Sequence, residues 1–340
     1  MNLNRHSRRI LLILFLSISC IHSQNVLYEV SATKFLMGTK FDIVALSPSV
    51  DSCRRVMYYA LKEVERIENL MSSYKASSEI SEINSHAGEH PVKVSFETYS
   101  IIRRSIEYSK KYDGLFDISI GPVSELWGLN TDHPVSKVPE KYVIDSLLKF
   151  VDYRNIVLNE NDTTVFLPYP RMNLDLGGIA KGYAVDRASK ILHDRGIDNY
   201  MVNGGGDLYV SGLKQDSSRW VIGIEHPRDK NKVIGTVELT NFALGTSGDY
   251  ERYVIIGGKR YHHIFDPRTG YPAPLSQSAS ALAPTTEEAV ILSKYLFIIG
   301  TEKYREYLKT SGVRGIVVDS AGNVFYDDRL LTENNFIPAK

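Results

Sequence analysis

The chain has 340 residues, 43% of them hydrophobic and 24% charged, which is typical of a globular protein long enough to bury a substantial core. Its 40 basic side chains are balanced by 40 acidic ones. Without net charge there is no global field to attract a polyanion, so the composition argues against nucleic acid as a partner.

The first predicted element is an export signal at 1–23. Three arginines precede the apolar run Ile10–Leu16, and small residues follow it. An apolar core this short is typical of a secretory signal peptide, because a permanent membrane span needs about 20 residues. We therefore predict an exported protein whose folded domain is 24–340.

The two cysteines bear on anchoring and on stability. Cys20 stands where a bacterial lipoprotein carries its lipid, but Ser17 occupies a position that is usually aliphatic in such signals, so cleavage after Ser23 is an equal alternative. The expected location is the periplasm, free or anchored to the inner membrane at Cys20. Cys53 then has no partner, which excludes a disulfide framework and predicts a small apolar helix residue.

Beyond the signal, hydrophobic periodicity and turn residues predict helices, then mostly strands. Thr285 and Glu288 form a capping box at the start of the last helix. No low-complexity linker divides the chain, so we expect a single α+β body. The expected elements are a strand at 36–45, helices at 54–71 and 96–112, a loop around 127–134, a hairpin at 154–167, a short strand at 173–176, a helix ending near 196, strands near 200–203, 207–211, 219–225, 232–238, 252–256, 260–265 and 278–283, a helix at 285–299, and a hairpin at 315–326.

The most informative segment is Asn173–Arg187, which places an acid, two glycines and a lysine at the mouth of a predicted helix. Glycines let a backbone approach a ligand closely, and a helix N-terminus presents unpaired N–H groups. Lys181 adds a positive charge in the first turn. The segment therefore predicts a cradle for a diphosphate, although tight packing of the glycines and a solvated Lys181 explain it equally well when it is taken alone.

Two further segments carry polar side chains between predicted strands. Asn203–Asp207 contains three glycines but lacks the helix of a dinucleotide-binding fingerprint, so a simple turn remains an alternative. Residues 262–272 combine histidine, carboxylate and arginine with two prolines that stiffen the loop. Adjacent strand residues point to opposite faces, so at most one of His262 and His263 can enter a given site.

Together these segments resemble the FAD:protein FMN transferases, also called the ApbE-like or thiamine-biosynthesis-lipoprotein family, over essentially all of residues 28–330. The family's fold is an α+β single body of sheet and helix that resembles a duplicated T-fold. The matching pieces, in family order, are Met37-Gly38-Thr39, Met71-Ser72-Ser73-Tyr74-Lys75, Ser78-Glu79-Ile80, Phe116-Asp117-Ile118-Ser119, Gly121-Pro122, Leu126-Trp127-Gly128, Asp175 to Arg187, the glycine triplet, Gly223-Ile224-Glu225-His226-Pro227, Thr246-Ser247-Gly248-Asp249-Tyr250, and His263 to Pro272.

The resemblance implies roles for individual residues. Asp175 would accept hydrogen bonds from FAD, Tyr74 would stack on a flat ring, and Ile264 would offer backbone contact. His263, Lys181 and Asp175 would form the catalytic set, with His263 as the base. The implied FAD site comprises Met37, Tyr74, Phe116, Asp117, Ile118, Asp175, Lys181 and Ile264.

The implied activity is covalent flavinylation: transfer of the FMN moiety of FAD to a threonine or serine hydroxyl of an acceptor protein, with release of AMP. His263 would take the hydroxyl proton, while Lys181 and the helix mouth would stabilise the phosphoryl oxygens. The acceptor would belong to the respiratory or electron-transfer flavoproteins. The chain itself contains no acceptor-like Asp-Gly-Ser/Ala-Thr segment.

The chain departs from the family where magnesium is usually bound. There the helix that begins here near Thr285 carries an aspartate and, four residues on, a threonine, which bind the metal with the backbone carbonyl that corresponds to Gly178. Alignment without a gap places Val290 and Lys294 at those positions, and neither is a magnesium ligand.

Three hypotheses follow from this departure. In the first, the Lys294 ammonium occupies the metal's place and transfer needs little or no magnesium. In the second, catalysis is impaired and the protein is an exported FAD-binding or FAD-hydrolysing relative. In the third, Glu287 or Glu288 swings in to bind a metal. A structural or adhesin-like β-protein is a different class, and it leaves the convergence of Asp175 and His263 unexplained.

Overall fold

The computed structural model describes residues 26–131 and 133–339. The predicted signal, with Cys20, lies outside these residues. Within the described ranges, no helix combines the length and the apolar character that a membrane crossing requires. Cys53 is buried in a helix, where burial raises the pKa of its thiol, as expected for a structural cysteine.

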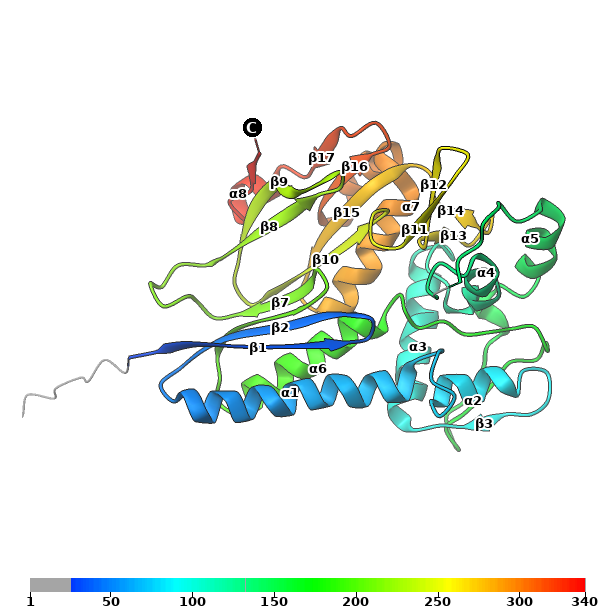
Figure 1. Cartoon of the computed structure of the whole chain (residues 1–340), viewed down its shortest axis with the longest axis horizontal. Helices are drawn as coiled ribbons and strands as arrows, with labels where there is room; N and C mark the ends of the chain where they lie inside the picture. Colours follow the sequence, from blue (N-terminus) through cyan, green and yellow to red (C-terminus); the bar gives the residue numbers. More distant parts are fainter. Residues whose placement is uncertain (1–25, 132, 340) are drawn as a thin grey trace, which may run out of the picture.

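A sheet of eight antiparallel strands forms the centre of the protein, in the order β1-β2-β6-β7-β10-β15-β16-β17. One face is covered by α1 (Val50–Met71), α6 (Ala180–Asp194) and α7 (Thr286–Ser311), with the larger core between the two layers (Figure 1). The strands are β1 (Tyr28–Leu36), β2 (Thr39–Ser47), β6 (Asn199–Gly204), β7 (Asp207–Ser211), β10 (Phe242–Gly248), β15 (Ser276–Ala283), β16 (Arg314–Asp319) and β17 (Val324–Tyr326).

The opposite face carries a second layer. A small sheet of β8 (Trp220–His226), β9 (Asp229–Leu239) and β18 (Ile337–Pro338), together with α8 (Arg329–Glu333), encloses a separate apolar core against the central sheet. The three long helices α1, α6 and α7 therefore cover one face of the central sheet, and the small sheet with the short helix α8 covers the other.

A third part of the protein lies beside the end of the sheet (Figure 1). In it Trp127, the last residue of α4, packs against α5 and the segment around Phe265. Its elements are α2 (Glu79–Ser85), β3 (Val92–Lys93), α3 (Phe96–Lys111), the 3-10 helix η1 (Ile118–Ile120), α4 (Gly121–Trp127), α5 (Lys141–Leu148), the 3-10 helix η2 (Tyr153–Asn155), β4 (Val157–Asn159), β5 (Thr164–Phe166), β11 (Tyr253–Ile256), β12 (Lys259–His262), β13 (Phe265–Asp266) and β14 (Tyr271–Pro272).

The predicted α+β class and single body are confirmed, and several elements are corrected. The strand expected at 36–45 is the second strand of a hairpin, whose turn residues Met37 and Gly38 have φ of 52° and 70°, as a type I′ turn requires. Residues 173–176 do not form the expected strand. Thr285 caps the last helix as predicted, but the Glu288 carboxylate pairs with Lys111 instead of completing the capping box, and the helix kinks at Gly300 and continues to Ser311. The helices α2, α4 and α5 and the strand β10 were not predicted.

Helices α6 and α7 are locked together at one crossing. A Cβ on Gly182 would lie 2.7 Å from the carbonyl oxygen of Thr286 and 2.8 Å from Val290 Cγ2, so only glycine allows this approach. The carboxylate of Asp186 accepts the N–H groups of Thr286 and Glu287 at 2.8 and 2.9 Å, which caps α7 from α6. Burial raises the pKa of Asp186 to about 6. Side chains on the two helices therefore keep a fixed relative position.

Candidate functional site

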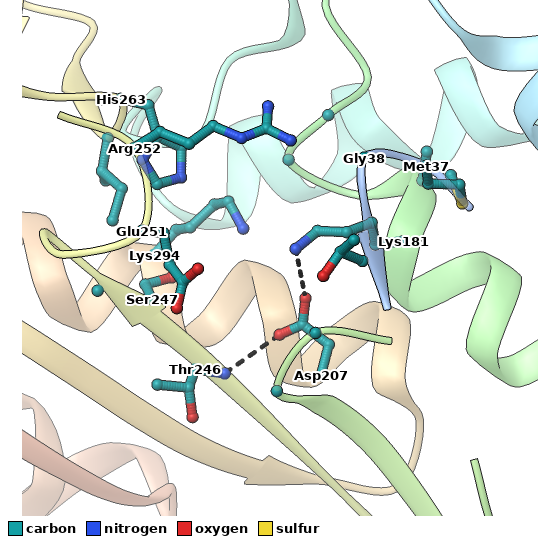
Figure 2. A pocket seen from close by; sticks show the side chains of 18 of the residues that line it. Met37, Gly38, Lys181, Asp207, Thr246, Ser247, Glu251, Arg252, His263 and Lys294 are labelled. Atoms are coloured by element: carbon teal, nitrogen blue, oxygen red, sulfur yellow. Dashed lines mark hydrogen bonds and ion pairs between the residues drawn. The ribbon is translucent and has the colours of Figure 1, made fainter. Parts of the chain in front are cut away.

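A cavity of about 1250 Å³ lies where the β1–β2 turn, the start of α6 and the middle of α7 meet (Figure 2). This volume exceeds what a drug-sized ligand occupies. Its wall is contributed by segments far apart in the chain: 37–40, 71–75, 115–117, 177–181, 205–208, 221–225, 246–248, 250–252 and 263–265, together with Lys294.

The loop before α6 is shaped by Asp175. Its Oδ1 accepts the N–H of Gly177 at 2.8 Å, and its Oδ2 accepts the hydroxyl of Ser124 at 3.1 Å. Its own N–H donates to the carbonyl of Ile118 at 2.8 Å. The carboxylate thus fixes the course of the two glycines, and each of its oxygens retains a lone pair for a ligand.

Two features leave the start of α6 open to an anion. No side chain caps this helix within the described residues, and although the N–H of Ala180 donates to the carbonyl of Leu176 at 2.8 Å, the N–H groups of Lys181 and Gly182 have no acceptor there. At Gly178 a Cβ would lie 3.0 Å from the ring of Phe116 and 3.6 Å from Cε of Lys294. A side chain at Gly178 would therefore be crowded by the ring of Phe116 and would be in van der Waals contact with Lys294.

Lys181, in the first turn of α6, faces the cavity beside Asp207. Its Nζ lies 3.3 Å from Asp207 Oδ2, and Asp207 Oδ1 accepts the N–H of Thr246 at 3.2 Å (Figure 2). Asp207 is buried, and it directly follows the glycine triplet at the β6–β7 turn. The triplet is thus a turn, and its functional side chain is the acid that follows it, which was not predicted.

The two adjacent histidines point to opposite sides, as expected. His262 is buried: its Nε2 lies 3.0 Å from the carbonyl of Ala273, its Nδ1 accepts the N–H of Ile264 at 3.2 Å, and burial lowers its pKa to about 4. His263 lines the cavity, and its buried Nδ1 has no partner among the described residues. Burial, then the neighbouring His262 and the lysines, hold the pKa of His263 well below its ordinary value, so the ring is neutral near pH 7.

The residues predicted for the FAD site come together, with one exception. Ile118 is 1% exposed and sits behind the wall, where its carbonyl supports Asp175. Asp117 lines the cavity, but its carboxylate is already bonded to Ser119 and Tyr153. The carbonyl of Ile264 accepts the N–H of Ala273 at 2.9 Å, which leaves one lone pair for the predicted backbone contact. The predicted residues that line the cavity are Met37, Tyr74, Phe116, Asp117, Asp175, Lys181 and Ile264, with His263 and Gly178.

Arg252 is a cavity residue that the sequence did not reveal. Its Nη1 donates to Asn130 Oδ1 at 3.0 Å, and a Cβ on Gly38 would lie 2.7 Å from its Nη2. The guanidinium therefore reaches from the β10 side of the cavity to the β1–β2 turn. Tyr74 stands at the mouth, 59% exposed, with its ring free to contact a ligand.

The residues at the expected magnesium position do not fit that ion. Val290 is 1% exposed, has no side-chain oxygen and packs against Gly182. Lys294 reaches the cavity as a cation, and its Nζ donates to the carbonyl of Val290 at 3.4 Å. Burial, assisted by Lys181 and opposed by Asp207, lowers the pKa of Lys294 to about 8. A hard cation requires oxygen ligands, and two of the three expected ones are missing.

Glu287 and Glu288 do not compensate for this loss. Glu287 forms a two-point ion pair with Arg104, both bonds 2.8 Å long, and Glu288 pairs with Lys111 at 3.2 Å; neither acid lines the cavity. The third hypothesis, a metal held by Glu287 or Glu288, therefore has no support. Among the described residues, a group of His86, Glu89 and His90 does bring donor atoms within 4.8 Å of one another, but it lies outside the cavity lining.

An α+β body with a large cavity, where two lysines and an uncapped helix start face a neutral histidine, is of the class that binds an anionic ligand and moves a proton. The chain belongs to the ApbE family, whose model matches residues 37–317. This confirms the resemblance inferred from the motifs.

Named relatives and solved structures agree with this assignment. The chain is 34% identical over 283 residues to a FAD:protein FMN transferase of Klebsiella pneumoniae, covering 83% of this chain and 85% of that one. It is 32% identical to one of Vibrio cholerae over 69% and 71% of the two chains. The crystal structure of the ApbE protein of Thermotoga maritima matches with a TM-score of 0.83 at 33% identity, over 89% of this chain and 97% of that one. The flavin transferase ApbE of Vibrio cholerae matches with a TM-score of 0.81 at 26% identity, over 90% and 99%.

Proposed function

We propose that this protein is an FAD:protein FMN transferase, which moves the FMN moiety of FAD onto a threonine or serine hydroxyl of an acceptor protein and releases AMP. One observation carries the proposal: the start of α6 with Lys181 and the neutral ring of His263 line the same cavity. The activity named for the relatives favours transfer over the alternative of FAD binding or hydrolysis without transfer.

The chemical step uses these groups in distinct ways. The acceptor oxygen attacks the FMN-side phosphorus of FAD, and the P–O bond to the AMP phosphate breaks as the new P–O bond forms. The hydroxyl proton passes to the ring of His263, which is neutral and can accept it. Lys181 and the N–H groups at the start of α6 stabilise the charge on the phosphoryl oxygens, because they are fixed there before the ligand arrives.

The remaining predicted residues hold the ends of FAD. Tyr74, exposed at the mouth, offers its face to a flat ring, and Met37 and Phe116 add apolar wall on either side. Asp175 accepts hydrogen bonds with the lone pairs that Gly177 and Ser124 leave free. Ile264 contributes its carbonyl in the same way.

The cellular setting is part of the proposal. The arginine-led apolar segment at 1–23 supports export to the periplasm, and Cys20 is the candidate site of a lipid anchor that would hold the enzyme on the inner membrane. The proposed acceptor is a respiratory or electron-transfer flavoprotein with a target threonine or serine on the same side of the membrane.

The experiment that tests the function uses residues 24–340, FAD and a synthetic peptide containing Asp-Gly-Ala-Thr. We expect mass spectrometry to find one FMN attached through the threonine, and chromatography to find one AMP for each modified peptide. His263→Gln should bind FAD but transfer little FMN, because the proton acceptor is lost. AMP formation without a modified peptide would indicate hydrolysis and contradict the proposal.

A further inference from the structure

We propose that the ammonium of Lys294 does the work of the family's divalent cation, so that this protein binds and uses the diphosphate of FAD without a metal. The inference rests on the proposed function and states how this site neutralises the negative charge of the diphosphate. It follows because Val290 and Lys294 lack the oxygen ligands that a magnesium site requires.

Lys294 reaches the place where the diphosphate would lie. Its Cε is 3.6 Å from the position of a Cβ on Gly178, so its amine lies beside the glycine loop at the start of α6. Figure 2 shows the amines of Lys181 and Lys294, which come from different helices, directed toward the same part of the cavity, with the ring of His263 nearby. Two positive charges thus face the space in front of the loop.

Among the described residues, the Lys294 amine forms no ion pair with a carboxylate, although Asp207 and Asp175 lie near enough to favour its charged form. Its described hydrogen bond, to the carbonyl of Val290, is 3.4 Å long, and no described carboxylate lies within 4.0 Å of it. Asp207, the nearby acid, pairs with Lys181 instead. An ammonium has three donors, so at least two remain for ligand oxygens. A largely buried cation without a counter-ion is costly, and an anionic ligand removes that cost.

The same arrangement excludes a metal. A divalent ion beside the Gly178 carbonyl would lie against the Lys294 amine, and like charges at such separation repel strongly. Val290 cannot offset this repulsion, because its side chain is apolar and fills the space against Gly182.

The fold fixes the helix that carries Lys294. Helix α7 lies so close to β10 that a Cβ on Gly245 would be 2.6 Å from the backbone of Ala289 and Val290. Asp186 ties the first turn of α7 to α6. Charge that is fixed before the ligand arrives stabilises a transition state without further reorganisation.

The test measures FAD affinity by calorimetry, in EDTA and in magnesium chloride, for the protein as it is and for two variants. The unmodified protein should bind FAD with the same affinity in both buffers. Lys294→Met, which keeps most of the stem and removes the charge, should bind FAD about tenfold more weakly, because charge-assisted hydrogen bonds are lost. Lys190→Met, on the exposed face of α6, is the matched control and should change nothing.

A direct metal readout completes the design. Manganese titrated into the unmodified protein and followed by electron paramagnetic resonance should remain free, whereas Val290→Asp/Lys294→Thr should bind it and should require it for tight FAD binding. Loss of FAD affinity in EDTA with recovery in magnesium, or an unweakened Lys294→Met, would overturn this inference alone. Failure of the unmodified protein to bind FAD in either buffer would overturn the proposed function as well.

Discussion

Replacing Gly182 by alanine tests whether the α6–α7 crossing controls the site. Alanine favours a helix interior over glycine by about 1 kcal/mol. The added methyl group, however, would lie 2.7 Å from the carbonyl oxygen of Thr286 and 2.8 Å from Val290 Cγ2. Thr286 cannot retreat freely, because its N–H is bonded to Asp186 at 2.8 Å and α7 already touches the sheet at Gly245. Overpacking at such a contact costs about 1–3 kcal/mol, so the clash outweighs the gain in propensity.

We therefore expect Gly182→Ala to lower the free energy of unfolding by about 1–2 kcal/mol in urea titrations followed by circular dichroism. FAD affinity should fall by about tenfold, because separating the helices moves Lys181 away from Lys294. Lys190→Ala, on the exposed face of the same helix, should stay within about 0.5 kcal/mol of the unmodified protein. A Gly182→Ala protein that is as stable as the original and binds FAD equally well would refute the reasoning.

Three further outcomes are expected. Tyr74→Ala should weaken FAD binding about five- to tenfold in fluorescence titrations, as loss of ring stacking predicts, whereas Tyr74→Phe should bind normally; equal effects would argue against stacking. Glu287→Gln should lower stability by about 1 kcal/mol through its lost ion pair with Arg104, yet leave FAD affinity unchanged in EDTA and in magnesium; a magnesium effect on this variant alone would contradict that. The pKa of His262 falls from 6.5 to about 4 on folding. As the pH drops below 6.5, the histidine is therefore protonated in the unfolded chain but stays neutral in the folded one. Between pH 7.5 and 5 the protein should therefore lose about 2 kcal/mol of stability relative to His262→Gln, and parallel pH profiles would refute the assignment.

The helices and hairpins that the sequence revealed share a simple physical signature. The helix at 54–71 buries one apolar stripe, and the hairpin at 315–326 pairs two apolar runs around a turn, so periodicity alone finds them. Helices α2 and α4 were not predicted because each has only seven residues, too few to show the helical period of apolar residues.

Strand β10 was not predicted for a different reason. Gly245 and Gly248 weaken any strand signal, yet Gly245 is needed because the backbone of α7 approaches within 2.6 Å of its would-be Cβ. The requirement comes from a helix more than 40 residues further along the chain. Local propensity contains no trace of such a contact, and only the assembled structure explains the glycine.

The residues of the site also fall into two groups, those that the sequence predicted and those that it did not. Asp175, Lys181 and His263 stand in motifs with a chemical rationale, and the structure gathers all three on one cavity. Asp207 and Arg252 were not predicted as site residues because the sequence around them does not indicate that their side chains face the cavity. Asp207 is brought to the cavity by the pairing of β6 with β7, and Arg252 by the loop that joins β10 to β11.

The α6–α7 crossing also explains why the side chains at the predicted metal position can be replaced without a change of fold. The positions that Val290 and Lys294 occupy are four residues apart, so both stand on the face of α7 that meets α6 and the cavity. Each side chain has a separate environment: Val290 fills the gap at Gly182, and Lys294 extends past it to Gly178. Exchanging both side chains therefore alters the charge in front of the glycine loop while Asp186 and Gly245 keep the helix in place. An oxygen at only one of the two positions would leave either an apolar wall or a competing ammonium, so the two substitutions must occur together for a metal to bind.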